Sequence, residues 1–170
     1  MDEARRPLAV ITRPRADAEA LAARVERAGF AALVEPLLEI RPTVAAMPPL
    51  DGYAALAFTS ANAARAFAVR AAAREMPAYA VGATTAAALR AAGGTTVRAR
   101  GPDVAGMARE IARDLPPRAR VLYPSGKAVA RALDSLLPGI RVDRLVVYDA
   151  VPAHALSQSL VDALYTRTVH

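Results

Sequence analysis

The sequence predicts an α/β fold, and three observations lead to that prediction. Short apolar runs alternate with longer segments in which apolar residues recur at helical spacing. The apolar runs are almost uninterrupted, as in parallel strands that helices cover on both faces of a sheet. The helical segments span about ten to fourteen residues, which is typical of βαβ units. Parallel sheets with crossover helices are therefore expected.

The first part of the chain predicts a strand, a helix and a second strand. "PLAVIT" is a short apolar strand, and "ADAEALAARVERAG" is a helix that stops at Gly29. "FAALVEPLLEI" is a second strand, which Pro36 breaks. A proline-rich turn, "MPPLDG", then leads into the middle of the chain.

The middle of the chain predicts a longer series of strand–helix pairs. In chain order the pairs are "YAALAFT" with "ANAARAFAVRAAA", "AYAVG" with "ATTAAALRAAG", "TVRAR" with "GPDVAGMAREIARDL", and "ARVLYP" with "SGKAVARALDSLL". "RVDRLVVYDAV" closes the series as a strand. The helix "ALSQSLVDALYTR" and the beginning of another strand, "TVH", follow it.

Two strand-like segments that end in proline, at Pro42 and Pro152, are expected to cross between two lobes. We assign the lobes and the crossing strands as follows: 44–147 to one domain, 1–38 and 152–170 to the other, and 39–43 and 148–151 to the linker. The discontinuous domain has few strands, so it should expose apolar surface and unpaired strand edges. We expect that domain to be incomplete, with more chain after His170.

Composition excludes several kinds of site. The 170 residues are 54% hydrophobic and contain no cysteine, so the chain can form a core but has neither disulfides nor thiolate metal sites. "MDEARRPLAV" has too short an apolar run for a signal peptide, and no stretch reaches the roughly 18 apolar residues of a membrane span. A cytoplasmic protein without a membrane partner is expected.

The net charge of +6 at pH 7 allows an acidic partner, either nucleic acid or a small polyanion. Lys127 is the only lysine among 22 basic residues, and the arginines are scattered along the predicted helices. Aromatic residues make up only 5% of the chain, whereas nucleic-acid binders usually interleave aromatics with clustered basic residues. Nucleic acid is therefore not expected as a partner, and a solvated arginine surface explains most of the charge.

Candidate ligand-binding residues follow the strands, because ligands of open parallel sheets lie beyond the carboxyl ends of the strands. The junctions contain Thr12-Arg13-Pro14, Thr59-Ser60-Ala61-Asn62, Gly82-Ala83-Thr84-Thr85, Gly101-Pro102-Asp103 and Pro124-Ser125-Gly126-Lys127. Any one of them could simply cap its helix. The same backbone amides and helix dipoles also suit phosphate or carboxylate, and the repetition favours a ligand with several anionic groups.

Familiar catalytic signatures are missing. The chain has no G-x-G-x-x-G and no complete phosphate-binding loop, since "PSGKA" keeps only the Gly-Lys pair. His154 and His170 are the only histidines, which excludes a histidine metal cluster and a Ser-His-Asp triad. An enzyme with this sequence would act mainly by binding and orienting its substrate.

Segments along essentially the whole chain resemble the uroporphyrinogen-III synthase family of tetrapyrrole biosynthesis. They are "VITRPRADAEALAARVERAGF", "EPLLEIRP", "YAALAFTSANAARAF", "YAVGATTAAALRAAG", "RVLYPSGKAVARAL" and "VDRLVVYDAVPA". The resemblance implies two flavodoxin-like α/β domains joined by a two-stranded linker, a monomer, and a reaction without cofactor or metal. It also implies the substrate, hydroxymethylbilane, which is closed to uroporphyrinogen III with inversion of ring D.

The resemblance also implies site residues. A tyrosine on the return linker strand is the family's suspected proton donor to the departing hydroxyl, and that position matches Tyr148; an equally open alternative is a tyrosine that packs in the linker. The implied substrate-binding residues are Thr12, Arg13, Thr59, Ser60, Asn62, Gly82, Thr84, Ser125 and Gly126. Lys127 is expected to replace an arginine that the family often has before this glycine. The alternative function is a non-catalytic flavodoxin-like module that binds another anionic small molecule.

Overall fold

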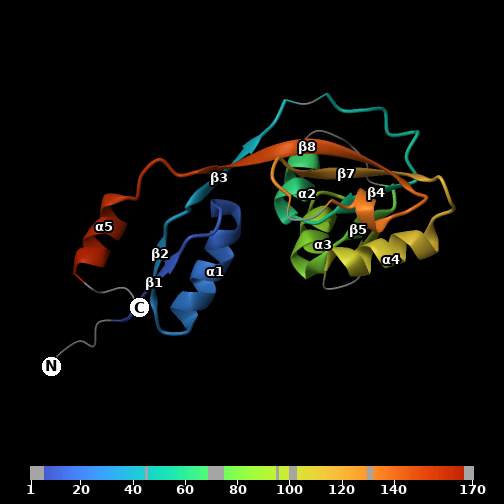
Figure 1. The fold of residues 1–170 in the computed structure, drawn as a ribbon. Coiled ribbons are helices and arrows are strands. Elements are labelled where there is room, and N and C mark those ends of the chain that lie inside the picture. Colours follow the sequence, from blue (N-terminus) through green and yellow to red (C-terminus); the bar gives the residue numbers. More distant parts are fainter. Residues whose placement is uncertain are drawn as a thin grey trace. The chain divides into compact units, whose positions relative to one another are not determined.

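In the computed structural model, which describes residues 6–44, 46–68, 75–94, 96–99, 103–129 and 132–166, parallel strands alternate with helices (Figure 1). The predicted α/β class is confirmed. The chain divides into a first unit, Met1–Ile40 with Ala150–His170, and a second unit, Arg41–Asp149. No helix among the described residues combines the length and the apolar character needed to cross a membrane.

The first unit contains a two-stranded parallel sheet and two helices. Its elements are β1 (Leu8–Ile11), α1 (Arg15–Arg27), β2 (Ala31–Val34) and α5 (Gln158–Tyr165). α1 ends before Gly29, whose φ of 93° suits glycine and terminates a helix. α5 begins after Ser157, whose side chain accepts a hydrogen bond from the amide of Leu160 at 3.2 Å.

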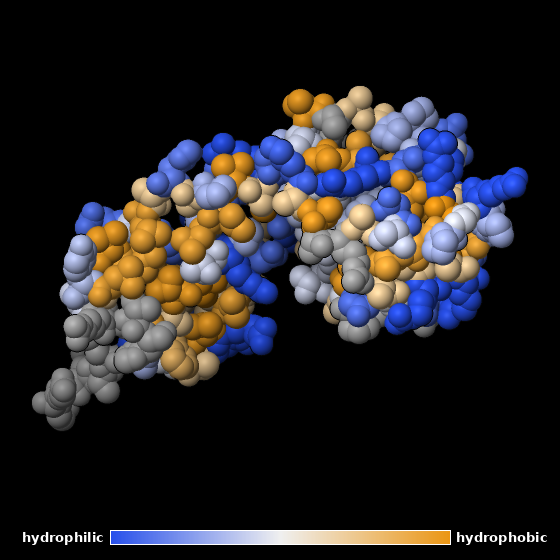
Figure 2. All heavy atoms as spheres, in the orientation of Figure 1, coloured by the Kyte–Doolittle hydropathy of each residue, from blue (hydrophilic) through white to orange (hydrophobic). Residues whose placement is uncertain are grey.

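Large apolar side chains remain exposed on the first unit. They are Phe30, Leu37, Leu38, Leu156, Leu164 and Tyr165. Figure 2 shows hydrophobic residues gathered on the visible face of this unit, over α5 and the neighbouring strands. The sequence predicts exposed apolar surface for these segments, and the described residues have it.

A six-stranded sheet in the order β3-β8-β7-β4-β5-β6 organises the second unit, and the first residues of β3 and the last residues of β8 belong to the first unit. Its strands are β3 (Leu38–Pro42), β4 (Ala55–Phe58), β5 (Ala78–Ala80), β6 (Val97–Ala99), β7 (Arg120–Gly126) and β8 (Arg141–Pro152). All pairs from β8 to β6 are parallel. β3 runs antiparallel to β8, since the amide of Thr43 donates to Val147 and the amide of Ala153 donates to Leu37.

Helices cover both faces of this sheet (Figure 1). They are α2 (Ala61–Ala68), α3 (Gly82–Ala91), α4 (Val104–Asp114) and the 3₁₀ turn η1 (Asp134–Leu136). Alternation along β4 sends Leu56 and Phe58 to a core with α2 and α3, and sends Ala55 and Ala57 to a core with α4. The nearly continuous apolar strands of the sequence are explained by this double coverage.

The helix predicted over residues 125–137 is wrong. β7 continues through Ser125 and Gly126, which pair with β8. The Arg144 guanidinium then donates to the carbonyls of Gly126 and Lys127, and the Lys127 amide donates to the carbonyl of Tyr148. Backbone groups that would begin a helix are therefore already bonded to β8. Among the described residues of the predicted helix, only Asp134–Leu136 are helical, as the 3₁₀ turn η1.

The other predicted elements agree with the structure apart from their bounds. "FAALVEPLLEI" forms two strands, β2 and β3, and Pro36 lies between them as the predicted break. The end of the predicted helix after β4, residues 69–73, lies outside the described residues, as does the strand predicted for "TVH". The last predicted helix is present as α5.

Candidate functional site

The carboxyl ends of β4, β7 and β8 bring several predicted site residues together in the second unit. β7 lies between β8 and β4, and all three strands are parallel, so their carboxyl ends share one edge of the sheet. Ser60 follows β4, Gly126 ends β7, and Tyr148 lies on β8 opposite Gly126. Residues separated by up to 88 positions in the chain meet here.

Ser60 is the centre of the hydrogen bonds at this edge. The phenol of Tyr148 donates to its Oγ at 3.2 Å, and the backbone amide of Asn62 donates to the same Oγ at 3.1 Å. The second bond is a local turn at the beginning of α2. Ser60 and Tyr148 are both half-buried, so the pair remains in contact with solvent.

Gly126 allows the ring of Tyr148 to lie directly against the backbone of β7. A Cβ atom at Gly126 would lie 2.6 Å from Cζ and 2.8 Å from the phenol oxygen of Tyr148, closer than real Cβ contacts allow. The register shifts at this point, because Ser125 pairs with Val146 whereas Gly126 pairs with Tyr148. Such a bulge re-aims the side chain that follows it. The position of the phenol thus depends on a glycine and a bulge.

Thr59 belongs to the other face of the sheet. Its hydroxyl hydrogen-bonds the phenol of Tyr123 at 2.9 Å, and Tyr123 is buried in the core that faces α4. Tyr148, the partner of Ser60, packs against the opposite core. The two neighbouring hydroxyls were expected to act together on a ligand, but their partners lie on opposite faces.

Ser125 is buried, with an exposed fraction of 2%, and its hydroxyl makes two hydrogen bonds. It donates to the carbonyl of Gly126 at 3.2 Å and accepts from Nε of Arg144 at 2.8 Å. The predicted role of Ser125 and Gly126 at a helix N-terminus is therefore wrong, because no helix begins there. Lys127 is exposed and pairs with Asp149 at 3.2 Å.

The remaining candidates of the second unit lie at the beginnings of α2 and α3. Gly82 has a φ of 75° and opens α3, whose first turn receives no side-chain cap. Thr84 is exposed, whereas its neighbour Thr85 is buried. The amide oxygen of Asn62 accepts from the Arg65 guanidinium at 2.5 Å. At α4, by contrast, Asp103 caps the helix by accepting from Gly106, so capping is observed at that junction.

Thr12 and Arg13 follow β1 in the first unit, and both side chains are exposed. The carbonyl of Thr12 accepts from the amide of Leu37 at 3.2 Å. α1 begins after Pro14, without a side-chain cap. This strand end therefore has a helix N-terminus without a side-chain cap and an exposed arginine, features that suit an anion.

Shifted pKa values belong to groups with structural partners. Hydrogen bonds from Arg120 hold the pKa of Asp143 below its ordinary value, at the amino end of β7. Hydrogen bonds from Ser157 lower the pKa of Glu35, which follows β2. The described residues contain no cluster of three metal-ligating side chains. The chemistry of the Ser60 edge therefore comes from hydroxyls, backbone amides and a few paired charges.

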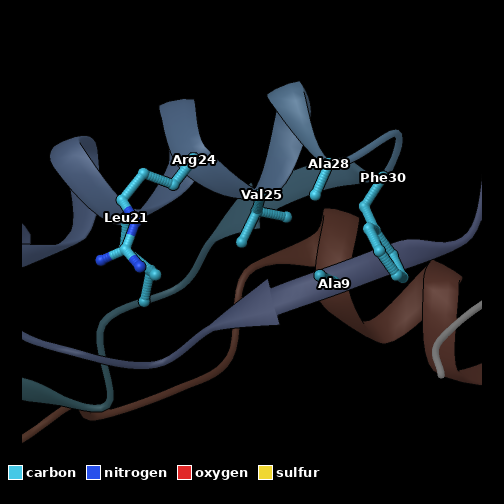
Figure 3. A pocket seen from close by; sticks show the side chains of 6 residues that line it. All are labelled: Ala9, Leu21, Arg24, Val25, Ala28 and Phe30. Carbon is cyan, nitrogen blue, oxygen red and sulfur yellow. The ribbon is translucent and has the colours of Figure 1, made fainter.

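A hollow of about 310 Å³ in the first unit contains none of the predicted site residues (Figure 3). It is lined by Ala9, Leu21, Arg24, Val25, Ala28 and Phe30. Figure 3 shows Val25, Ala28 and Phe30 reaching from α1 and the turn after it toward Ala9 on β1. This lining is mostly apolar and offers a polyanion only the guanidinium of Arg24.

Sequence reasoning missed three residues that shape the site. Arg65 lies three positions after Asn62, so helical spacing could have paired them. Tyr123 lies on β7, where strand alternation could have placed it on the face opposite Leu122. Arg144 contacts the end of β7 only through the register of β8, which no local sequence signal reveals.

A family model described as uroporphyrinogen-III synthase HemD matches residues 19–170. A uroporphyrinogen-III synthetase structure from Helicobacter pylori is 23% identical with a TM-score of 0.58, and the match covers 94% of this chain and 68% of that one. A mutant uroporphyrinogen III synthase from Thermus thermophilus is 20% identical with a TM-score of 0.54, and the match covers 96% and 70%. These two structures are similar in fold. A comparison with curated proteins gives no match.

Proposed function

The chain belongs to the uroporphyrinogen-III synthase family, and from this membership we propose that it closes hydroxymethylbilane to uroporphyrinogen III. The reaction removes one water and inverts ring D of the linear tetrapyrrole. The observation that carries the proposal is the family match, which spans 19–170 and includes the strand ends of the second unit, whereas β1, Thr12 and Arg13 precede the matched residues. The enzyme is a cyclising hydro-lyase of tetrapyrrole biosynthesis.

Neutral hydrogen-bond donors suit this substrate. Its pyrroles carry acetate and propionate side chains, and backbone amides at helix N-termini bind carboxylates without adding titratable groups. The uncapped first turns of α3 and α1 offer such amides, next to Gly82 and Thr84 in the second unit and to Thr12 and Arg13 in the first. Asn62 offers a polar side chain at the beginning of α2. These residues are our proposed carboxylate contacts.

The reaction begins with loss of the hydroxymethyl oxygen as water, which leaves a cationic azafulvene. The substituted carbon of ring D then attacks this cation, and the resulting spiro intermediate fragments and recloses with ring D inverted. A phenol such as that of Tyr148 can hydrogen-bond the departing oxygen. Thr59, Ser125 and Gly126 contribute through their contacts with Tyr123, Arg144 and Tyr148, which hold the sheet edge in shape.

The proposed organisation has two domains, with β3 and β8 as the linker strands between them. The family relationship supports a cytoplasmic monomer that needs no cofactor, because the reaction involves no net oxidation or reduction. The boundaries that we propose are 1–38 with 152–170 for the first domain, 44–147 for the second, and 39–43 with 148–151 for the linker.

The test is to incubate the purified chain with hydroxymethylbilane, oxidise the products and separate the porphyrin isomers. In water the substrate closes unaided to the non-inverted I isomer, so the III isomer reports catalysis. We expect the III isomer to dominate and its yield to rise with protein concentration. Formation of the I isomer alone, at the rate without protein, would contradict the proposed function.

A further inference from the structure

We propose that Ser60 gives its proton to the departing hydroxyl and that the phenol of Tyr148 then gives its own proton to Ser60. The two hydroxyls thus form a proton relay. The inference rests on the proposed function, because it concerns the first step of the same reaction. It differs from direct donation by Tyr148, in which Ser60 would only bind substrate.

The direction of the hydrogen bonds supports the relay. Tyr148 donates its phenol hydrogen to Oγ of Ser60, and the Asn62 amide donates to the same oxygen. Ser60 thus accepts twice, which uses both lone pairs of a hydroxyl. Among the described residues no group accepts the hydrogen of Ser60 itself. That hydrogen is the one available to a ligand, whereas the phenol hydrogen is engaged.

The backbone of β7 restricts the position of the Tyr148 side chain on the side away from Ser60. The backbone of Gly126 lies so close to the phenol that even a methyl group would collide with Cζ and the oxygen. The carbonyl of Tyr148 is held by the Lys127 amide at 2.9 Å. Because the ring cannot move toward β7, its hydroxyl stays directed at Ser60. The 3.2 Å bond is long for two hydroxyls, and catalytic hydrogen bonds often shorten only when substrate binds.

Charged side chains near the pair already have partners. Arg65 donates to Asn62, and Lys127 is paired with Asp149. Asp149 follows Tyr148 on β8, and successive strand residues point to opposite faces. No carboxylate among these residues is therefore directed at Ser60. The phenol is the available acid behind it.

The proposed step balances in atoms and charge. The C–O bond of the hydroxymethyl group breaks and its electron pair leaves with oxygen, which takes the proton of Ser60 and departs as water. Ser60 takes the phenol proton, so Tyr148 becomes a phenolate and the substrate a pyrrole-stabilised cation. Ring closure later releases one proton from a pyrrole carbon, and this proton returns to Tyr148. The net change is the loss of one water.

A double-mutant cycle on the full chain tests the relay. The variants are Ser60→Ala, Tyr148→Phe, the combination of both, and Ser60→Thr, which keeps a hydroxyl. Matched controls are Ser135→Ala, an exposed hydroxyl in η1, and Tyr165→Phe at the exposed end of α5. Formation of the III isomer gives kcat and KM for each variant, and thermal unfolding confirms that each one folds.

The relay predicts that each single variant lowers kcat by about 100-fold, within the usual contribution of general acid catalysis. KM should change by less than about threefold, because the loss concerns the transition state. The double variant should be no slower than the single variants, since either change interrupts the same path. Ser60→Thr should recover most of the activity, and both controls should match the unmodified chain.

Other outcomes overturn the relay. Losses that multiply in the double variant would mean that the two hydroxyls act independently. Near-normal kcat for Ser60→Ala with a slow Tyr148→Phe would show direct donation by the tyrosine. If the unmodified chain forms the III isomer but the effects of the two substitutions are additive in free energy, the relay is wrong and the proposed function stands. If the unmodified chain forms no III isomer, both the relay and the proposed function are wrong.

Discussion

Thr59 and Ser60 illustrate how neighbouring residues acquire different roles. They follow the same strand, yet the hydroxyl of Thr59 contacts Tyr123 beside the core under α4, while Ser60 contacts Tyr148 beside the core under α2 and α3. The strand alternation that builds two cores also separates these two hydroxyls. Ser60 accepts from both Tyr148 and the Asn62 amide, which leaves its own hydrogen available to a ligand.

Replacement of Gly126 by Ala should impair activity more than stability. The new Cβ would collide with the end of the Tyr148 side chain. The side chain can rotate away, which lowers the stability of the fold by about 1–3 kcal/mol. That rotation would break the contact between the phenol and Ser60. We expect kcat to fall nearly as far as in Tyr148→Phe, while urea unfolding shows a modest loss.

Gly52→Ala is the control for this change. Gly52 is exposed, and a Cβ there would meet only the guanidinium end of Arg120 at 3.0 Å. It should leave kcat unchanged. Full activity in Gly126→Ala would show that the close approach of Tyr148 to β7 has no functional role.

α5 of the first unit depends on a carboxylate that follows β2. Oε1 of Glu35 accepts from the Ser157 amide at 2.6 Å, and Ser157 in turn caps α5. Hydrogen bonds from Ser157 lower the pKa of Glu35, so its ionised form is more stable in the folded protein. The stabilisation is therefore present above the ordinary glutamate pKa and is lost as pH falls through the lowered pKa.

Glu35→Gln should loosen α5 at neutral pH but not in acid. Hydrogen exchange of the α5 amides, corrected for intrinsic rates, should be faster in the variant at about pH 7. The difference should shrink as pH falls through the lowered pKa of Glu35, because the unmodified carboxylate then becomes protonated as well. Glu19→Gln, at an exposed position on α1, should match the unmodified chain throughout. A difference that grows toward low pH would contradict this role of Glu35.

Elements with strong local patterns could be predicted from the sequence, and elements set by distant contacts could not. The buried run of β4 and the Gly29 stop of α1 are local signals, and both gave correct elements. Residues 125–137 also have a helical pattern, but pairing with β8 and the bonds from Arg144 keep Ser125 and Gly126 in a strand. Tertiary contacts override propensity there.

The same limit applies to the candidate site. The sequence placed Ser60 and Gly126 at strand ends, and the family resemblance placed Tyr148 on the return linker strand. The structure brings these three together. It did not reveal that Ser125 is buried, because its place in β7 is set by pairing with β8, another strand. The bulge that pairs Gly126 with Tyr148 is likewise a property of two strands and has no signal in either one.

At the scale of the whole molecule, the family match and the neutral donors at the strand ends support the same function. A tetrapyrrole with many carboxylates needs a binding surface wider than one helix N-terminus. The second unit provides amides and hydroxyls after β4 and β5, while its charged pairs around Asp143 and Asp114 lie at other places and bind one another. The central claim is that this carboxyl edge holds the tetrapyrrole.

Amide NMR of the isotope-labelled chain during titration with uroporphyrinogen III tests that claim most directly. We predict that the largest shifts occur at residues 59–62, 82–84, 126 and 148, and that they saturate with added ligand. Shifts confined to the apolar hollow around Phe30, or no saturable shifts at all, would contradict it.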